Sequence, residues 1–373
     1  MIVGAGQAGF QTALSLRLEG YAGQITLVDD EGRLPYARPP LSKAFLKNDA
    51  APESLEYRPA EFFQQQAIEF VAGDAAVAID RSASLVRLRS GRELPYSALV
   101  LATGAHVRTL PGGSGKVAYI RTVADSLMFR ERLRAGGELL AIGGGFIGLE
   151  AAAAAQSMGM SVRLMTAEKR LMGRAVSDFI SDWFAALHER HGVTLQLGAA
   201  VSRLDDPELG SPDTIVVGIG VIPNTALAEA AGLEAFSGIV TDSYLRTSDP
   251  AIYAVGDCAL HPNAYAEGLA RLESVQNAAD QARVVASTLA GKPKRYSHVP
   301  WFWTEQFEAK LQIAGMPGET DEAEVRGDPE TGKFSVYNYR AGKLRFVESV
   351  NKPADHIAAR KLLELPPSIL EDS

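Results

Sequence analysis

Two glycine-rich loops constrain the fold of this chain more than any other feature. Residues 4–9 read G-A-G-Q-A-G after a short β-branched run, and residues 143–148 read G-G-G-F-I-G after the apolar run 139–142. Each loop precedes a helix-like segment, which in the second copy includes the alanine run 151–155. The pattern G-x-G-x-x-G between a strand and a helix lets the backbone approach a pyrophosphate that rests on the helix N-terminus. One such loop can be only a turn, whereas two copies predict two bound dinucleotides.

Composition excludes several other classes of protein. The chain has 373 residues, a net charge of −8 and a hydrophobic fraction of 46%, which suits two or three globular domains without a general nucleic-acid surface. Its apolar runs are shorter than the roughly 18 residues of a membrane span, and we expect no signal peptide. The single cysteine, Cys258, excludes an intrachain disulfide framework and a cysteine-rich metal site, and it suits a reducing cytoplasm.

Acidic residues follow the second strand of the first βαβ unit. Strand 25–28 leads into Asp29, Asp30 and Glu31. In this fold an acid at that place accepts hydrogen bonds from a ribose diol, so we expect the cluster to bind a nucleotide. The alternative is that these acids lie in a solvated turn and bind no ligand.

The next segment, residues 31–46, is rich in proline and basic side chains. Arg38 and Lys43 would place positive charge beside the nucleotide site, where a pyrophosphate or a reduced flavin requires it. Ser42 is a candidate N-cap for a following helix. The alternative is a rigid proline-rich linker.

Alternating apolar and polar residues continue the chain. Residues 68–104 predict an antiparallel meander, residues 105–120 a crossover, and residues 124–134 a helix. After the second glycine loop we expect these elements, by residue number: strand 161–165, a helix from residue 175 followed by strand 193–197, strands 215–224, 239–242 and 252–258, a helix 273–289, strands 311–314, 334–339 and 344–350, and a final helix 353–363.

The second βαβ unit departs from the usual pattern at the end of its second strand. Thr166 stands where an acid is expected, and Glu168 lies two residues farther on. Lys169, Arg170 and Arg174 follow, and such cations would accommodate a 2′-phosphate. We expect NADH, because Glu168 would reach the ribose, with NADPH as the alternative.

Motifs along the whole chain resemble those of the FAD-dependent ferredoxin reductases of the putidaredoxin reductase and palustrisredoxin reductase type. The resemblance is specific because many motifs occur together. Besides the first loop they are Leu34-Pro-Tyr-x-Arg-Pro-Pro-Leu-Ser-Lys43, Leu101-Ala-Thr-Gly104, Tyr119-Ile-Arg-Thr122, Gly143-Gly-Gly-x-Ile-Gly-Leu-Glu150, Val217-Gly-Ile-Gly-Val-Ile-Pro-Asn224, Val255-Gly-Asp-Cys258, Arg271-Leu-Glu-Ser-Val-Gln-Asn277 and Val299-Pro-Trp-Phe-Trp303.

The resemblance implies an α/β fold with two Rossmann-like dinucleotide-binding domains and a C-terminal α+β domain. Residues 1–112 and 241–300 would form the FAD-binding domain, residues 113–240 the NAD(P)H-binding domain, and residues 301–373 the C-terminal interface domain.

The same resemblance implies the residues that bind the cofactors. Those implied for FAD are Gly4, Gly6, Ala8, Gly9, Asp30, Arg38, Lys43, Ala76, Thr103, Gly104, Arg121, Asp257 and Val275. For NAD we carry over Gly143, Gly145, Ile147, Gly148, Glu150 and Gly220, and we add Thr166 and Arg174 as the positions that bear on coenzyme choice.

Four residues are implied for catalysis. Lys43 would stabilise negative charge on the reduced ring, Glu150 and Glu273 would lie near the nicotinamide carboxamide, and Trp303 would lie on the route to an iron–sulfur partner. For Trp303 the alternative is core packing. For Glu150 it is a favourable interaction with the helix dipole.

The implied activity is transfer of a hydride from NAD(P)H to FAD and of single electrons to a [2Fe-2S] ferredoxin or rubredoxin. That carrier would feed a haem monooxygenase or a ring-hydroxylating dioxygenase. Dithiol catalysis is excluded because Cys258 is alone, and we expect it to be a packed core residue. The alternative is an NAD-sensing or oxidase flavoprotein of the apoptosis-inducing-factor type. We expect a monomer or weak dimer, with Lys292, Lys294, Arg295 and Lys310 as candidates for a local basic patch.

Overall fold

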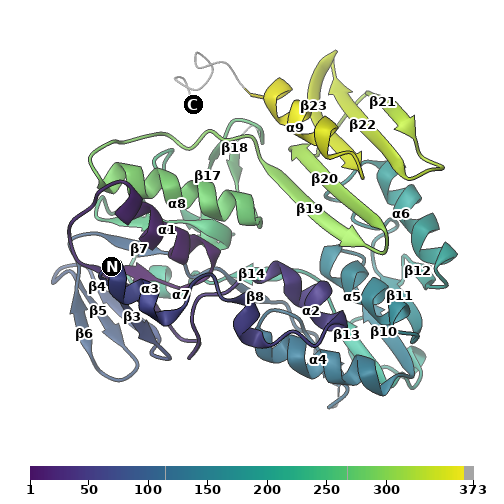
Figure 1. The fold of residues 1–373 in the computed structure, drawn as a ribbon, viewed down its shortest axis with the longest axis horizontal. Helices are drawn as coiled ribbons and strands as arrows, with labels where there is room; N and C mark the ends of the chain where they lie inside the picture. The colour runs from purple at the N-terminus through teal and green to yellow at the C-terminus, as the bar shows by residue number, and fades with distance from the viewer. Residues whose placement is uncertain (114, 267, 365–373) are drawn as a thin grey trace.

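The computed structural model describes residues 1–113, 115–266 and 268–364. Two parallel five-stranded sheets with helices lie side by side, and an antiparallel sheet with one helix adjoins the second of them (Figure 1). This arrangement confirms the predicted fold class. None of the helices in the described residues is both long and apolar enough to cross a membrane.

The first parallel sheet has the strand order β16-β7-β1-β2-β3. Alternate side chains of β1 face opposite ways: Ile2 packs with α1 and α8, whereas Val3 packs with a small antiparallel sheet. The elements are β1 (Ile2–Val3), α1 (Gln7–Leu18), β2 (Ile25–Asp29), β3 (Ile68–Ala72), β7 (Leu99–Leu101), β16 (Ile252–Ala254) and α8 (Val275–Leu289).

The predicted meander over residues 68–104 was only partly right. Its middle strands β4 (Ala76–Asp80), β5 (Leu85–Leu88) and β6 (Glu93–Pro95) form the small antiparallel sheet. Its first and last strands, β3 and β7, instead join the parallel sheet. Local alternation is the same in both kinds of strand, so it does not reveal which partner a strand will pair with.

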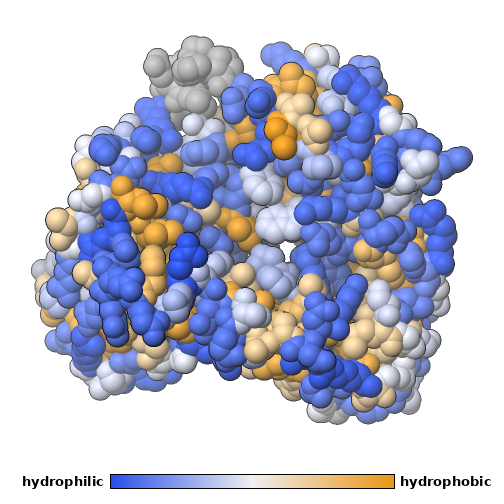
Figure 2. Space-filling view, viewed as in Figure 1, coloured by the Kyte–Doolittle hydropathy of each residue, from blue (hydrophilic) through white to orange (hydrophobic). Residues whose placement is uncertain are grey.

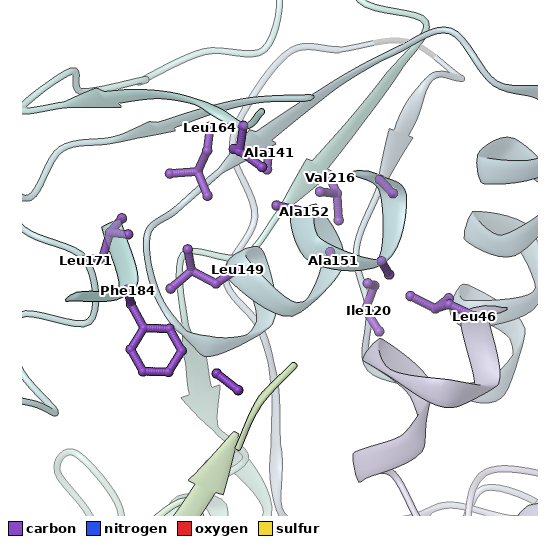
Figure 3. Close-up of a cluster of buried hydrophobic side chains, with 14 of the residues drawn as sticks. Leu46, Ile120, Ala141, Leu149, Ala151, Ala152, Leu164, Leu171, Phe184 and Val216 are labelled. Carbon is purple, nitrogen blue, oxygen red and sulfur yellow. The ribbon is translucent and has the colours of Figure 1, made fainter. Parts of the chain in front are cut away.

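The second parallel sheet repeats this design with the order β12-β11-β10-β13-β9. Its helix α5 lies at the centre of the largest apolar cluster, where Leu149 and Ala152 approach strand residues and Phe184 of α6 (Figure 3). The elements are β9 (Val117–Ala118), α4 (Val123–Ala135), β10 (Glu138–Ile142), α5 (Phe146–Ser157), β11 (Ser161–Thr166), α6 (Asp178–Arg190), β12 (Thr194–Leu197) and β13 (Thr214–Val217).

A loop takes the place of a small sheet on the other face of the second unit. Leu140 and Ile142 of β10 pack with Leu204 and Leu209 from the segment 201–213, which contains only the short η3 (Pro207–Leu209). Loop side chains, with Leu110 and Val201 beside the two leucines, therefore pack on this face, whereas β4, β5 and β6 form a small sheet in the first unit.

The C-terminal sheet has the antiparallel order β19-β20-β23-β22-β21. Phe334 and Val336 of β22 join the core cluster of α6, while α9 packs with β20 and β23. Strand β21 was not predicted, because all its residues are exposed and it lacks apolar alternation. The elements are β19 (Trp301–Gln306), β20 (Ala309–Gly315), β21 (Glu322–Asp328), β22 (Lys333–Arg340), β23 (Lys343–Val350) and α9 (Pro353–Leu362).

Short elements connect these layers. Strands β8 (Ala105–Val107) and β14 (Val221–Pro223) pair antiparallel where the chain leaves and re-enters the first unit. The others are η1 (Pro39–Ser42), α2 (Ala44–Lys47), η2 (Pro52–Leu55), α3 (Ala60–Gln65), α7 (Ala226–Ala230), β15 (Ile239–Val240), η4 (Gly256–Cys258), β17 (Ala259–Asn263) and β18 (Gly268–Ala270).

Candidate functional site

A cavity of about 1110 Å³ lies at the carboxyl ends of β1, β7 and β16. The first turns of α1, α5 and α8 and the aromatic side chains of β19 also line it. The molecular surface is hollowed between the first parallel sheet and the C-terminal sheet (Figure 2). In open α/β sheets this edge is where ligands bind.

The first glycine loop is shaped for close backbone contact. Gly4 has φ +99°, and a Cβ there would lie 2.2 Å from the carbonyl oxygen of Ala102. A Cβ on Gly9 would lie 1.8 Å from the carbonyl oxygen of Gly4, so helix α1 can approach the loop only with glycine. A Cβ on Gly6 would meet no atom within 4 Å, which leaves its backbone open to the cavity. Ala8 also lines the cavity, whereas Gly9 packs behind it.

Asp29, the last residue of β2, and Asp30, which follows it, have different roles. The Ala5 N–H donates to Asp29 Oδ1 at 2.6 Å and the Glu31 N–H donates to Asp29 Oδ2 at 3.1 Å, so Asp29 holds the loop. Burial raises the pKa of Asp29 to about 6. Asp30 is exposed and lines the cavity, which leaves its carboxylate available to a ribose.

Basic side chains surround the cavity near the first loop. Arg38 donates to the Arg121 carbonyl oxygen at 2.7 Å and pairs with Glu31 at 2.5 Å. Arg121 in turn pairs with Asp257 at 3.1 Å. Each of these four side chains lines the cavity. Polar groups therefore alternate in charge along a wall where phosphates and a polyol chain could bind.

Two hydrogen bonds between Thr103 and Asn224 join the two segments that connect the parallel sheets. Thr103 Oγ1 donates to the Asn224 carbonyl oxygen at 2.7 Å, and Asn224 Nδ2 donates to the Thr103 carbonyl oxygen at 2.8 Å. Gly104, Ala76 and Val275 line the same cavity. Every implied FAD residue except Gly9 thus lies on the cavity wall.

The second glycine loop has the same construction. Gly143 has φ +110°, and a Cβ there would lie 2.3 Å from the carbonyl oxygen of Gly218. A Cβ on Gly148 would lie 2.1 Å from the carbonyl oxygen of Gly143. Ile147 lines the cavity, but Gly143, Gly145, Gly148 and Gly220 are absent from its lining. The structure therefore places this loop beside the cavity, with only the first turn of α5 reaching into it.

Glu150 is the most constrained carboxylate of the site. Its side chain is 1% exposed, and Lys43 Nζ lies 2.8 Å from its Oε1. Thr304 Oγ1 donates to the same oxygen at 2.6 Å, and Ser42 Oγ donates to Oε2 at 2.5 Å. The predicted N-cap role of Ser42 was wrong, because its hydroxyl makes this contact and no side chain caps α2.

The other two implied catalytic residues lie in more open positions. Glu273 lines the cavity and pairs with Arg271 at 2.6 Å. Trp303 is half-buried and lines the cavity with Phe302, whose ring lies 4.5 Å from that of Phe146. Since Trp303 borders open space, its indole is not simply enclosed by the core.

The residues expected to select the coenzyme lie away from the cavity. Thr166 is buried under the second loop, where a Cβ on Gly144 would lie 3.1 Å from its Cγ2. Arg174 pairs with Glu168 at 2.6 Å, and Arg170 pairs with Asp178. Two of the three cations after β11 therefore already have an acidic partner.

Two cations of the proposed basic patch also have acidic partners. Lys292 pairs with Glu19 at 2.9 Å, and Lys310 pairs with Glu305 at 3.1 Å. Lys292 follows the C-terminal end of α8, whereas the cavity lies at its N-terminal end, about 22 Å away along a helix of 15 residues. The structure thus separates Lys292 from the cavity.

The single cysteine, Cys258, is packed in the core. Cys258 is fully buried, its thiol donates to the carbonyl oxygens of Leu101 and Val255, and burial raises its pKa. This confirms the expectation of a packed thiol. Within the described residues, three His, Cys, Asp or Glu side chains do not cluster in a way that could hold a metal ion.

Sequence reasoning missed the polar residues that hold the site together. Asn224 is the last residue of the motif 217–224, and Thr304 directly follows the motif 299–303. The residues next to them in sequence do not indicate which hydrogen bonds these two side chains make. Tyr57, whose hydroxyl donates to Gln7 Oε1 at 2.6 Å, also lines the cavity. The partners of these side chains are distant in sequence, so no local spacing could have identified them.

Known proteins resemble this chain over nearly its full length. Residues 1–282 match the family model described as pyridine nucleotide-disulphide oxidoreductase, and residues 301–371 match the one described as reductase C-terminal. Rhodocoxin reductase of Rhodococcus erythropolis is 45% identical, over 98% of this chain and 90% of its own length. The ferredoxin–NAD(+) reductase component of the anthranilate 1,2-dioxygenase system of Burkholderia cepacia is 39% identical, over 97% of this chain and 93% of its own. The solved ferredoxin reductase for the CYP199A2 system from Rhodopseudomonas palustris has a TM-score of 0.93 and 44% identity, covering 96% of this chain and 93% of that one.

Proposed function

Because this chain belongs to the pyridine nucleotide-disulphide oxidoreductase family, as a ferredoxin reductase of the putidaredoxin and rhodocoxin reductase type, we propose its function on that basis. It is an FAD-dependent NAD(P)H:ferredoxin oxidoreductase that supplies electrons to a ferredoxin or rubredoxin for an oxygenase system. The observation that carries this function is one cavity shared by a glycine-loop helix from each parallel sheet and by Trp303 of the C-terminal sheet.

The cavity wall suits FAD. Gly6 leaves its backbone open, and the N-termini of α1 and α8 face the cavity, so their partial positive charges favour a pyrophosphate. Arg38 and Arg121 also line the cavity, each paired with an acid, Glu31 and Asp257, so they supply hydrogen-bond donors rather than net positive charge. Asp30 is available to the adenosine ribose, and Asp257 to the ribityl chain. FAD, when bound, accepts two electrons as a hydride and releases them singly, so two ferredoxin molecules are reduced per turnover.

Lys43 and Glu150 are the charged pair of this site. The ammonium of Lys43 would stabilise negative charge that develops on a reduced ring. Glu150, at the start of α5, would orient the nicotinamide carboxamide together with Glu273. Trp303 would lie between the ring and the partner protein. The proximity of these four side chains to one cavity supports these roles.

The coenzyme that we propose is NADH. Arg174 and Arg170 are engaged by Glu168 and Asp178, so they offer less free positive charge to a 2′-phosphate than the sequence suggests. Glu168 is half exposed and follows the strand end where a ribose diol is usually bound. The relative from the anthranilate dioxygenase system is named for NAD(+).

The domain division that we propose assigns residues 1–112 and 241–300 to FAD, residues 113–240 to NADH and residues 301–373 to the partner interface. The two separate parallel sheets support this division for most of the chain, whereas α7 packs on β4 and β15 pairs with β17, so the last part of the second range lies against the first unit. We place the protein in the cytoplasm, to which its single buried cysteine is suited.

A steady-state assay tests the function. The FAD-loaded protein should oxidise NADH much faster with a [2Fe-2S] ferredoxin present than with oxygen alone, since the carrier provides the route for single electrons. Reduction of two ferredoxin molecules per NADH is expected. Turnover that is no faster with any of a panel of ferredoxins and rubredoxins would overturn the proposal.

A further inference from the structure

A buried chain of hydrogen bonds connects helix α6 with the charged pair of the cavity. His188 Nε2 lies 2.8 Å from Gln306 Oε1, and Gln306 Nε2 donates to Thr304 Oγ1 at 3.3 Å. Thr304 Oγ1 donates to Glu150 Oε1 at 2.6 Å, and Lys43 Nζ lies 2.8 Å from that same oxygen. His188, Gln306 and Thr304 are 0% exposed and Glu150 is 3% exposed. Burying polar groups costs free energy unless they are hydrogen-bonded. The placement of four such side chains in one buried chain of hydrogen bonds therefore requires an explanation.

The donors of this chain all point toward the carboxylate. Because Gln306 donates its amide hydrogen to Thr304, its oxygen is the acceptor for His188 Nε2–H. Burial lowers the pKa of His188 to about 4, so the ring is a neutral donor at physiological pH. Its Nδ1 has no hydrogen-bond partner in the described part of the chain. Successive bonds of one direction polarise one another, and here they strengthen the final bond to Glu150.

Strand β19 supplies both a cavity side chain and the end of this chain. Trp303 lines the cavity, whereas the next residue, Thr304, is buried and reaches Glu150. Successive residues of a strand point to opposite faces, so one rigid element orients both groups. With Ser42 on Oε2 and Thr304 on Oε1, neither carboxylate oxygen is free to turn away from Lys43.

We propose that Thr304 is a positioning residue for the reductase reaction, because its hydroxyl, held by Gln306, fixes the Glu150 carboxylate against Lys43. The C-terminal sheet thereby completes the hydride-accepting half of the site as well as facing the partner. This inference rests on the proposed function. If Thr304 only satisfied a buried polar group, its removal would lower stability without changing the environment of the bound flavin.

The test compares FAD-loaded Thr304→Val, which keeps shape but removes the hydroxyl, with Thr304→Ser, which keeps the hydroxyl. In Thr304→Val we expect a shifted visible absorption spectrum of the bound flavin, because Lys43 loses its fixed partner. The rate constant for flavin reduction by NADH should fall about tenfold, as is typical when a hydrogen bond to a charged group is lost. Thr304→Ser should restore both, and the KM for ferredoxin should stay constant in both variants.

Thr241→Val is the matched control. Thr241 is also buried, but its hydroxyl donates to the Leu260 backbone carbonyl at 3.3 Å, away from the cavity lining. It should leave the spectrum and the reduction rate unchanged. A Thr304→Val protein with the wild-type spectrum and rate, or a Thr304→Ser protein as impaired as Thr304→Val, would overturn the inference.

A second variant decides the question if Thr304→Val does not fold. Gln306→Met removes the amide that holds Thr304, and it should shift the spectrum in the same direction with a smaller loss of rate. An unchanged Gln306→Met protein would then count against the inference. Absence of NADH-dependent flavin reduction in the wild-type protein would instead refute the proposed function, so the two failures are distinguishable.

Discussion

At the scale of single residues, the site depends on charges held in fixed positions. Glu150 is almost fully buried, yet three donors satisfy its carboxylate: Ser42 and Lys43 from one loop and Thr304 from β19. A buried carboxylate is tolerated only with such partners. Single residues also determine which coenzyme is preferred and whether the thiol of Cys258 can react.

Thr166→Glu should sharpen the preference for NADH. A carboxylate at the end of β11 would accept hydrogen bonds from a ribose diol and repel a 2′-phosphate. We expect kcat/KM with NADPH to fall about tenfold more than kcat/KM with NADH, measured by ferredoxin-coupled turnover. Thr166→Ser is the control. A wild-type preference for NADPH, or a ratio unchanged by the substitution, would contradict the assignment.

Cys258→Ala should retain activity. The thiol is buried, its pKa is raised, and it lies against backbone carbonyls, so it has no access to substrate. We expect ferredoxin reduction within about twofold of wild type and a loss of about 1 kcal/mol in the free energy of unfolding, from the removed sulfur. A large loss of activity in a folded variant would show that the thiol takes part in the reaction.

At the scale of elements, the C-terminal sheet is tied to the second unit by a buried acid. Glu348 of β23 is fully buried and accepts from the Ser177 N–H at 2.8 Å, at the start of α6, and from Asn338 Nδ2 at 3.0 Å. Burial raises the pKa of Glu348 from 4.5 to about 7. The acid therefore binds a proton more tightly in the folded than in the unfolded protein.

The contribution of Glu348 to stability should consequently fall as pH rises through this window, in the direction opposite to the contributions of the buried histidines, whose pKa values burial lowers. Because the folded pKa lies above the unfolded one, the contribution of the protonated acid is present at low pH and is lost between about pH 4.5 and 7. Glu348→Gln should lack this loss, so relative to wild type it should gain about 2 kcal/mol in unfolding free energy between pH 5 and pH 8. Urea unfolding at both pH values measures the difference.

Glu322→Gln, on the exposed strand β21, is the control and should keep the wild-type dependence on pH. Equal pH dependence in Glu348→Gln and wild type would show that Glu348 does not titrate in this range.

At the scale of the whole molecule, one cavity connects the three sheets. Its wall is built from the first parallel sheet, from helix α5 of the second unit and from β19, so a molecule bound there contacts all three parts. Binding to the folded state alone stabilises it by mass action, by about 4 kcal/mol at a free ligand concentration 1,000 times Kd.

Removal of FAD should lower the melting temperature of the entire protein in a scanning calorimeter. Re-addition of FAD should restore it, whereas FMN, which lacks the adenosine that we propose binds near Asp30, should restore it less. Identical melting curves of the FAD-free and FAD-loaded protein would contradict the assignment of the cavity.

Local features of the sequence determined much of this architecture. The two glycine loops required close backbone contacts, and the structure has them at Gly4 and Gly143. Apolar periodicity predicted the core helices α4 and α8 close to their observed bounds. The glycine spacing and the apolar periodicity are each read within a few residues, although the carbonyl groups that Gly4 and Gly143 approach, at Ala102 and Gly218, are distant in sequence.

Only the tertiary structure decided which distant segments meet. Ser42 contacts Glu150 across 108 residues and Thr304 contacts it across 154 residues. Strand β3 pairs in parallel with β2, and β21 is formed by pairing with β22 although its own residues are exposed. Hydrogen bonds and strand pairs of this kind satisfy backbone and buried polar groups wherever a partner is available. Their partners are selected by packing of the whole chain, so no spacing along the sequence encodes them.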